Sequence, residues 1–167
     1  MENKKNSQLK KQTFFADVML GRLAKWLRIL GYDTAYTRDI QHEKLASLAK
    51  KEGRLILTRS RKITKLLEPS EYILIEGNFV VEQLKQIVRE CNLDIAGNPV
   101  FTRCLICNGE LISLSRDGVK EEVPDFIYKR YDEFSKCLNC SRVYWPGTHY
   151  NRVEEVIKQL KNYDTHQ

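Results

Sequence analysis

The first ninety residues repeat one pattern four times: a short apolar run, then a longer segment with apolar residues at helical spacing. The short runs predict strands at 13–16, 34–37, 55–58 and 72–75. Apolar residues three and four positions apart predict helices at 19–30, 43–51, 60–67 and 79–91. Strict alternation of strands and helices is typical of a parallel sheet with helices on both faces. We therefore expect an α/β sandwich over residues 13–91.

The pattern changes after Cys91, which falls on the apolar side of its helix and is expected to be a small core residue. The next ten residues, NLDIAGNPVF, contain the breakers Gly97 and Pro99 and predict a linker at 92–101. Beyond the linker the sequence predicts short β-like segments at 119–123, 126–128 and 142–145, and an amphipathic stretch at 153–160.

Four of the five cysteines form two pairs, Cys104-x-x-Cys107 and Cys137-x-x-Cys140. Two such turns, each holding two sulfurs on one side of the backbone, complete a tetrahedral four-thiolate cage. The spacing predicts a structural zinc ribbon, with iron in a rubredoxin-like cage or a redox dithiol as alternatives. Four thiolates leave no open position for water on zinc, so catalysis would lie elsewhere. The metal does not then need His149, which we expect to form a hydrogen bond within the ribbon.

The aromatic side chains of the ribbon allow two interpretations. Tyr144, Trp145 and Tyr150 could offer faces on which nucleobases stack, but in so small a unit we expect them to form its core. The whole chain then divides into a disordered basic tail (1–12), an α/β domain (13–91), a linker (92–101), a zinc ribbon (102–152) and a C-terminal helix (153–167).

Composition adds a charge asymmetry. The chain has 28 Lys and Arg against 22 Asp and Glu, and residues 1–98, with 18 and 12 of these, hold the whole surplus of +6. A basic surface suits a polyanionic partner, although the tail could equally be a solubilising leader. Mean hydropathy is −0.48 and the apolar runs are short, so we expect no membrane span and no signal segment. We expect a cytoplasmic protein with reduced thiols, which favours metal over disulfides.

Acidic residues follow two of the predicted strands. Asp17 follows the first strand and Asp39 the second, and the carboxyl ends of parallel strands meet at one edge of a sheet. Clustered carboxylates are tolerated where they share Mg²⁺ or Mn²⁺, and Glu43 could be a third ligand. The alternative is that both aspartates cap helices and that Glu43 is an exposed helix-face charge.

Basic residues lie near these carboxylates along the sequence. Arg22, Lys25 and Arg28 fall on the polar side of the first predicted helix, while Arg59 and Arg61 follow the third strand. We expect Arg22, Lys25, Arg59 and Arg61 to contact a nucleic acid backbone.

Over about residues 13–152 the chain contains, in order, FFADVMLGRLAKWLRILGYDTAYTRD, EGRLILTRSR, RCLICNGEL, VPDFIY and FSKCLNCSRVYWPGTHY. These runs resemble the Mut-seven C-terminal RNase domain family. The resemblance implies a PIN-like three-layer sandwich with a mainly parallel sheet, followed by a small β-rich four-Cys zinc ribbon. It also implies that Asp17 and Asp39 bind Mg²⁺ or Mn²⁺. The family usually has an aspartate in a Thr-Arg-Asp-Arg motif where this chain has Ser60.

Two functions follow from these observations. The first is a metal-dependent endoribonuclease that hydrolyses RNA, with Asp17, Asp39, Glu43 and Ser60 as the predicted catalytic set. The second is a non-catalytic RNA-binding or ribonucleoprotein-interaction module. Ser60 favours the second function, because a hydroxyl supplies none of the charge that holds a metal.

Overall fold

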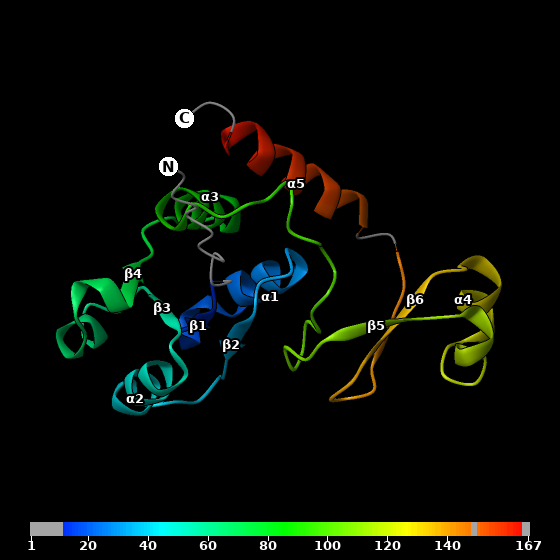
Figure 1. The fold of residues 1–167 in the computed structure, drawn as a ribbon, viewed down its shortest axis with the longest axis horizontal. Helices are drawn as coiled ribbons and strands as arrows, with labels where there is room; N and C mark the ends of the chain where they lie inside the picture. The colour runs from blue at the N-terminus through cyan, green and yellow to red at the C-terminus, as the bar shows by residue number, and fades with distance from the viewer. Residues whose placement is uncertain (1–11, 148–149, 165–167) are drawn as a thin grey trace, which may run out of the picture.

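The computed structural model describes residues 12–147 and 150–164, so the predictions for the basic tail and for His149 lie outside the described residues. Its first sheet is parallel, with the order β2-β1-β3-β4 (Figure 1). The strands are β1 (Phe14–Ala16), β2 (Thr34–Tyr36), β3 (Leu55–Thr58) and β4 (Tyr72–Leu74). All four predicted strands are confirmed. Because β2 and β3 lie on opposite sides of β1, the carboxyl end of β1 is a switch point where such sheets bind ligands.

Helices cover both faces of this sheet. Along the chain the structure places η1 (Val18–Leu20), α1 (Gly21–Ile29), α2 (His42–Glu52), η2 (Ile63–Leu66), η3 (Pro69–Glu71) and α3 (Val80–Cys91). The segment predicted as a helix at 60–67 is a short 3₁₀ turn instead. Alternation within β1 separates the two faces: Phe14 and Ala16 pack with α1 and α3, whereas Phe15 packs with α2. The predicted three-layer sandwich is confirmed.

The ribbon, residues 102–147, contains a second, antiparallel sheet with the order β5-β6-β7. Its strands are β5 (Leu111–Leu114), β6 (Phe134–Cys137) and β7 (Val143–Tyr144). Between β5 and β6 the chain forms η4 (Arg116–Val119) and α4 (Asp125–Arg130), so the predicted β-like segments at 119–123 and 126–128 are wrong. The reason is visible in the sequence, because Val119, Val123 and Ile127 are four positions apart and Pro124 precedes the first turn of α4.

The ribbon has its own small core, but not the one expected. Val119, Val123, Ile127 and Phe134 are buried together. Tyr144 is half-buried, while Trp145 and Tyr150 are exposed, so the expectation that these aromatic residues form the core is wrong. The excursion between β5 and β6, residues 115–133, supplies most of the buried apolar residues of this core. The ribbon core is therefore filled without Trp145 and Tyr150, which lie at the surface.

The last helix, α5 (Tyr150–Asp164), returns to the first domain and lies beside α3 (Figure 1). Val156 and Leu160 are buried in the same cluster as α1, α3 and β1. The predicted linker is also packed: Leu93 and Ile95 are buried in that cluster, and Gly31, at φ +81°, contacts the backbone of Pro99 so closely that a Cβ would overlap it. Within the described residues no helix is long and apolar enough to cross a bilayer.

Candidate functional site

The four ribbon cysteines converge on one point. Their Sγ atoms all lie within 4.8 Å of one another, with Cys104 and Cys140 3.6 Å apart and Cys107 and Cys137 3.4 Å apart. A tetrahedral zinc site with Zn–S bonds of about 2.3 Å has sulfurs roughly 3.8 Å apart, so the cage has the right size for zinc. Cys104 and Cys137 are buried, whereas Cys107 and Cys140 lie at the surface.

Hydrogen bonds reach the two buried sulfurs of the cage. The backbone N–H of Cys107 points at Cys104 Sγ over 3.5 Å, and that of Asn139 at Cys137 Sγ over 3.4 Å. The Tyr144 hydroxyl lies 3.0 Å from Cys104 Sγ. Burial alone would raise the pKa of Cys104, but the N–H group of Cys107 and the hydroxyl of Tyr144 bring that pKa below its ordinary value.

Arg28 joins this cage to the first domain, which the sequence pattern did not indicate. Its side chain is only 3% exposed, not part of the polar side of α1 as expected. The guanidinium donates from Nε to the carbonyl of Thr34 (2.9 Å), and from one terminal nitrogen to the carbonyls of Leu105 (2.8 Å) and Ile106 (3.1 Å). Leu105 and Ile106 are the two residues between the first pair of cysteines, so α1 holds that turn directly. Burial lowers the pKa of Arg28, and the nearby cysteines oppose that shift.

A second polar cluster reinforces the same junction. The Asn108 side chain accepts a hydrogen bond from the N–H of Thr34 and donates one to the Asp33 carboxylate. Arg54, at the start of β3, also donates to Asp33. Burial would raise the pKa of Asp33, but hydrogen bonds from Arg54 and Asn108 hold it below its ordinary value. The ribbon is thus fixed to the amino end of β2 through several partners, and Arg54 links that end to β3.

Asp17 lies at the opposite end of the sheet, directly after β1, and is 1% exposed. Its carboxylate accepts hydrogen bonds from the Val18 N–H (2.6 Å) and from the Thr58 hydroxyl (2.7 Å). The first bond confirms the capping interpretation for Asp17, which precedes η1. The same interpretation is wrong for Asp39, because the N-cap position of α2 is occupied by Gln41. The Thr58 hydroxyl also accepts a hydrogen bond from the Ser60 N–H (3.0 Å), so the backbone of Ser60 is two hydrogen bonds away from the Asp17 carboxylate.

The other predicted acidic residues are placed differently. Asp39 and Glu43 are exposed, the first between β2 and α2 and the second in the first turn of α2. Among residues 12–147 and 150–164, the four cysteines are the one group of three or more Cys, His, Asp or Glu side chains whose ligand atoms converge within 4.8 Å. The structure therefore does not bring Asp17, Asp39 and Glu43 together as a three-carboxylate cage.

The predicted nucleic-acid contacts lie on two elements. Arg22 and Lys25 are exposed and lie three positions apart on α1. Arg59 follows β3 and donates a hydrogen bond to the Asn78 side chain (2.9 Å), and this bond links the loops after β3 and β4. Arg61, two residues later, is exposed. Arg22 and Arg59 thus belong to segments that start at the carboxyl edge of the sheet, where Asp17 lies.

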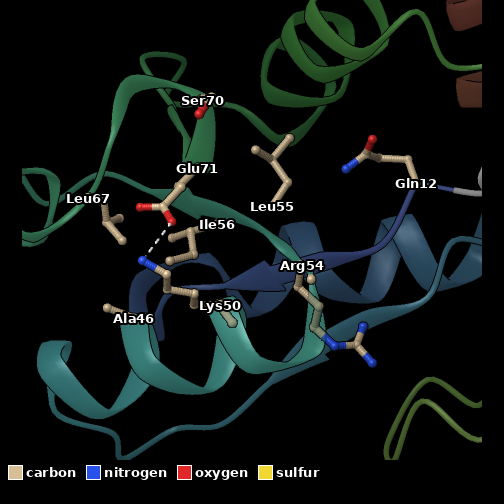
Figure 2. Close-up of a pocket in the computed structure, with 11 residues that line it drawn as sticks. Gln12, Ala46, Lys50, Arg54, Leu55, Ile56, Leu67, Ser70 and Glu71 are labelled. Atoms are coloured by element: carbon tan, nitrogen blue, oxygen red, sulfur yellow. Dashed lines mark ion pairs between the residues drawn. The ribbon is translucent and has the colours of Figure 1, made fainter.

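A pocket of about 250 Å³ opens at the amino ends of β3 and β4, between α2 and the segment that leads into β4. Figure 2 shows Lys50 and Glu71 facing each other in this pocket, with their charged atoms 3.8 Å apart, and Leu55 at the start of β3. None of the predicted site residues lines it, so its position does not support the predicted acidic site.

Comparison with known proteins adds two findings. The chain is 30% identical over 111 residues to the exonuclease mut-7 homolog of Homo sapiens, an alignment that covers 63% of this chain and 13% of that protein. The chain therefore corresponds to a small part of that relative. A family model described as the Mut7-C RNAse domain matches residues 12–157, a span that includes both sheets and all four cage cysteines. The chain belongs to the Mut7-C RNAse domain family, as the resemblance in its sequence predicts.

Proposed function

We propose that this chain is a metal-dependent endoribonuclease whose reaction takes place at the carboxyl end of β1. The observation that carries the proposal is the position of Asp17, a buried carboxylate at the switch point of a parallel sheet. Family membership supports a nuclease-type activity. The human relative is named an exonuclease, an enzyme that cleaves a nucleic acid from its end. That mode of cleavage does not carry over to this chain, because the alignment covers 13% of that protein.

Asp17 and Asp39 are the residues that would hold Mg²⁺ or Mn²⁺. Both offer hard carboxylate oxygens, and Mg²⁺ in proteins is often held by only one or two carboxylates while it keeps several waters. A bound divalent ion would activate water and stabilise charge on the attacked phosphodiester. Thr58 donates to the Asp17 carboxylate and fixes its orientation, and Arg22 and Arg59 would bind neighbouring phosphates of the RNA.

Zinc belongs to the proposal as a structural ion. The spacing of the four sulfurs fits zinc, and the proposed role of the ion is to fold the two cysteine turns, the first of which Arg28 also holds. The closed cage keeps this ion out of the reaction.

A cleavage assay on circular single-stranded RNA tests the enzyme, because only an endonuclease can open a circle. Wild-type protein should linearise the circle in Mn²⁺ or Mg²⁺, and Asp17→Asn should abolish cleavage while it leaves zinc content and circular dichroism unchanged. Asp117→Asn in η4, an exposed aspartate of the ribbon, is the matched control and should cleave like wild type. Equal cleavage by Asp17→Asn and wild type would refute the assignment of Asp17.

Ser60 provides a second test of the same site. Because Ser60 is linked to Asp17 through Thr58, an aspartate at position 60 would bring a second carboxylate to the end of β1. Ser60→Asp should therefore raise metal-dependent cleavage, and an unchanged rate would show that position 60 is not part of the site.

A non-catalytic RNA-binding module is the second candidate. Two observations favour it: Ser60 carries no charge, and within the described residues no group of three carboxylates converges. Its signature would be RNA binding that falls steeply with salt and is independent of Mg²⁺, without cleavage by either the wild-type chain or Ser60→Asp.

A further inference from the structure

A cleft of about 390 Å³ lies between α1 and the ribbon, and neither Asp17 nor Asp39 lines it. Lys25 lines it from α1, and Ile106, Arg142 and Trp145 line it from the ribbon. Trp145 is 37% exposed and Ile106 is 54% exposed. Large apolar side chains that stay exposed beside one another in a small β-rich unit commonly mark a binding surface.

The charge of the cleft favours an anionic ligand. Lys25 and Arg142 are exposed, and within the described residues neither forms a salt bridge. The carboxylate of the cleft, Glu122, is already paired with Lys136 at 2.7 Å. The cleft therefore combines an accessible indole with two unpaired cations, which is the combination that binds single-stranded nucleic acids.

The cleft is also placed along a path from Asp17. The chain passes from Asp17 through η1 into α1, where Arg22 and Lys25 are exposed one turn apart. Arg22 lies in the first turn of α1, near the carboxyl edge of the sheet, and Lys25 reaches the cleft. The exposed basic side of α1 thus connects the two places.

We propose that this cleft binds one unpaired nucleobase of single-stranded RNA, stacked on the indole of Trp145, with Lys25 and Arg142 on the neighbouring phosphates. The inference rests on the proposed action on RNA and specifies the form of RNA that the chain takes. In a duplex, stacking between neighbouring base pairs covers both faces of a base, so double-stranded RNA does not fit the cleft in this way.

The fluorescence of Trp145 can report whether the cleft is occupied. The chain has two tryptophans, Trp26 and Trp145, so in a Trp26→Phe background all tryptophan fluorescence comes from Trp145. The second substitution Asp17→Asn keeps the RNA intact, and zinc content confirms that the protein is folded. A ten-nucleotide single-stranded RNA should quench the fluorescence and saturate, whereas the same sequence as a duplex should not.

Affinity measurements on variants test the contacts. Trp145→Leu should weaken single-strand binding about 5- to 150-fold, the range for loss of one stacked base, and Trp145→Phe should restore most of the affinity. Lys25→Ala should lower affinity and reduce the slope of log affinity against log salt by about 1. Phe126→Leu, which replaces an exposed aromatic residue of α4 that does not line the cleft, should bind like the parent.

The outcomes separate this inference from the proposed nuclease activity. RNA binding without any change in Trp145 fluorescence, and with Trp145→Leu binding as tightly as the parent, would overturn the cleft even if the chain cleaves RNA. Quenching by single-stranded RNA without cleavage by the Asp17-containing protein would support the cleft and refute the nuclease. Equal quenching by polyglutamate at matched charge would overturn RNA in favour of an acidic protein partner.

Discussion

Arg28→Met should destabilise the protein and loosen the ribbon from the first domain at the same time. The guanidinium makes three hydrogen bonds to carbonyls of Thr34, Leu105 and Ile106 from a position that is 3% exposed. Methionine keeps the apolar contacts of the arginine stem but offers no donor. The three carbonyls, of which that of Thr34 is buried, would then lose their charged partner.

The expected loss of unfolding free energy is about 3 kcal/mol. Hydrogen bonds to charged groups contribute roughly 1.5–3 kcal/mol each, which gives a gross loss of about 5–9 kcal/mol for three. Removal of a buried charge offsets part of this loss, because its desolvation costs several kcal/mol. Arg28→Lys should lose less unfolding free energy than Arg28→Met, because an ammonium keeps the positive charge. It should still lose some, because one ammonium does not reach both the carbonyl of Thr34 and those of Leu105 and Ile106.

Urea unfolding followed by circular dichroism measures the free energy, and the rate of zinc transfer to a chromogenic chelator measures how firmly the first cysteine turn is held. Arg22→Met is the matched control, because Arg22 lies on the same helix with an exposed side chain. It should change stability by less than about 0.5 kcal/mol. A loss below 1 kcal/mol for Arg28→Met, with unchanged zinc transfer, would refute the reasoning.

Three further predictions concern other parts of the structure. Leu160→Ala, in a fully buried position of α5, should cost about 2–5 kcal/mol in urea unfolding, whereas exposed Lys158→Ala should cost under about 0.5 kcal/mol; equal effects would show that α5 does not contribute to the core. Asp33→Asn should be less stable than the parent at pH 7, because the lowered pKa of Asp33 adds stability that is lost as pH falls through it; the difference should shrink below about pH 4, and a constant difference would contradict the ion pair. Cys107→Ser should reduce bound zinc, measured by elemental analysis, from one ion per chain, and full retention would exclude the four-sulfur cage.

Local sequence patterns were sufficient for much of the fold. The strands, the place of Asp17 at the carboxyl end of the first strand and the meeting of the two cysteine pairs all follow from spacing along the sequence, and these predictions are confirmed by the strand pairing and by the sulfur positions. The roles of Asp17, Asp39, Glu43 and Ser60 stay predictions, because catalysis depends on a metal and a substrate as well as on position.

Long-range packing explains what the sequence did not indicate. A helical wheel places Arg28 with Arg22 and Lys25, but Leu105 and Ile106, which bury Arg28, are 77 and 78 residues away. The exposure of Trp145 has the same origin, since the apolar excursion between β5 and β6 fills the ribbon core. The four-residue spacing of Val119, Val123 and Ile127 is the signal in the sequence that indicates the helical character of that excursion.

The return of α5 to the first domain makes the ribbon, in topological terms, an insertion between α3 and α5. Val156 and Leu160 share a core with Phe14, from which they are separated by more than a hundred residues. Contacts of such high sequence separation slow folding, and chains are synthesised from the amino end. On the ribosome, the apolar surface of the first domain that α5 covers, next to α3, must therefore stay exposed until the whole ribbon has been made. The two halves of this chain are consequently expected to mature as one cooperative unit and not in succession.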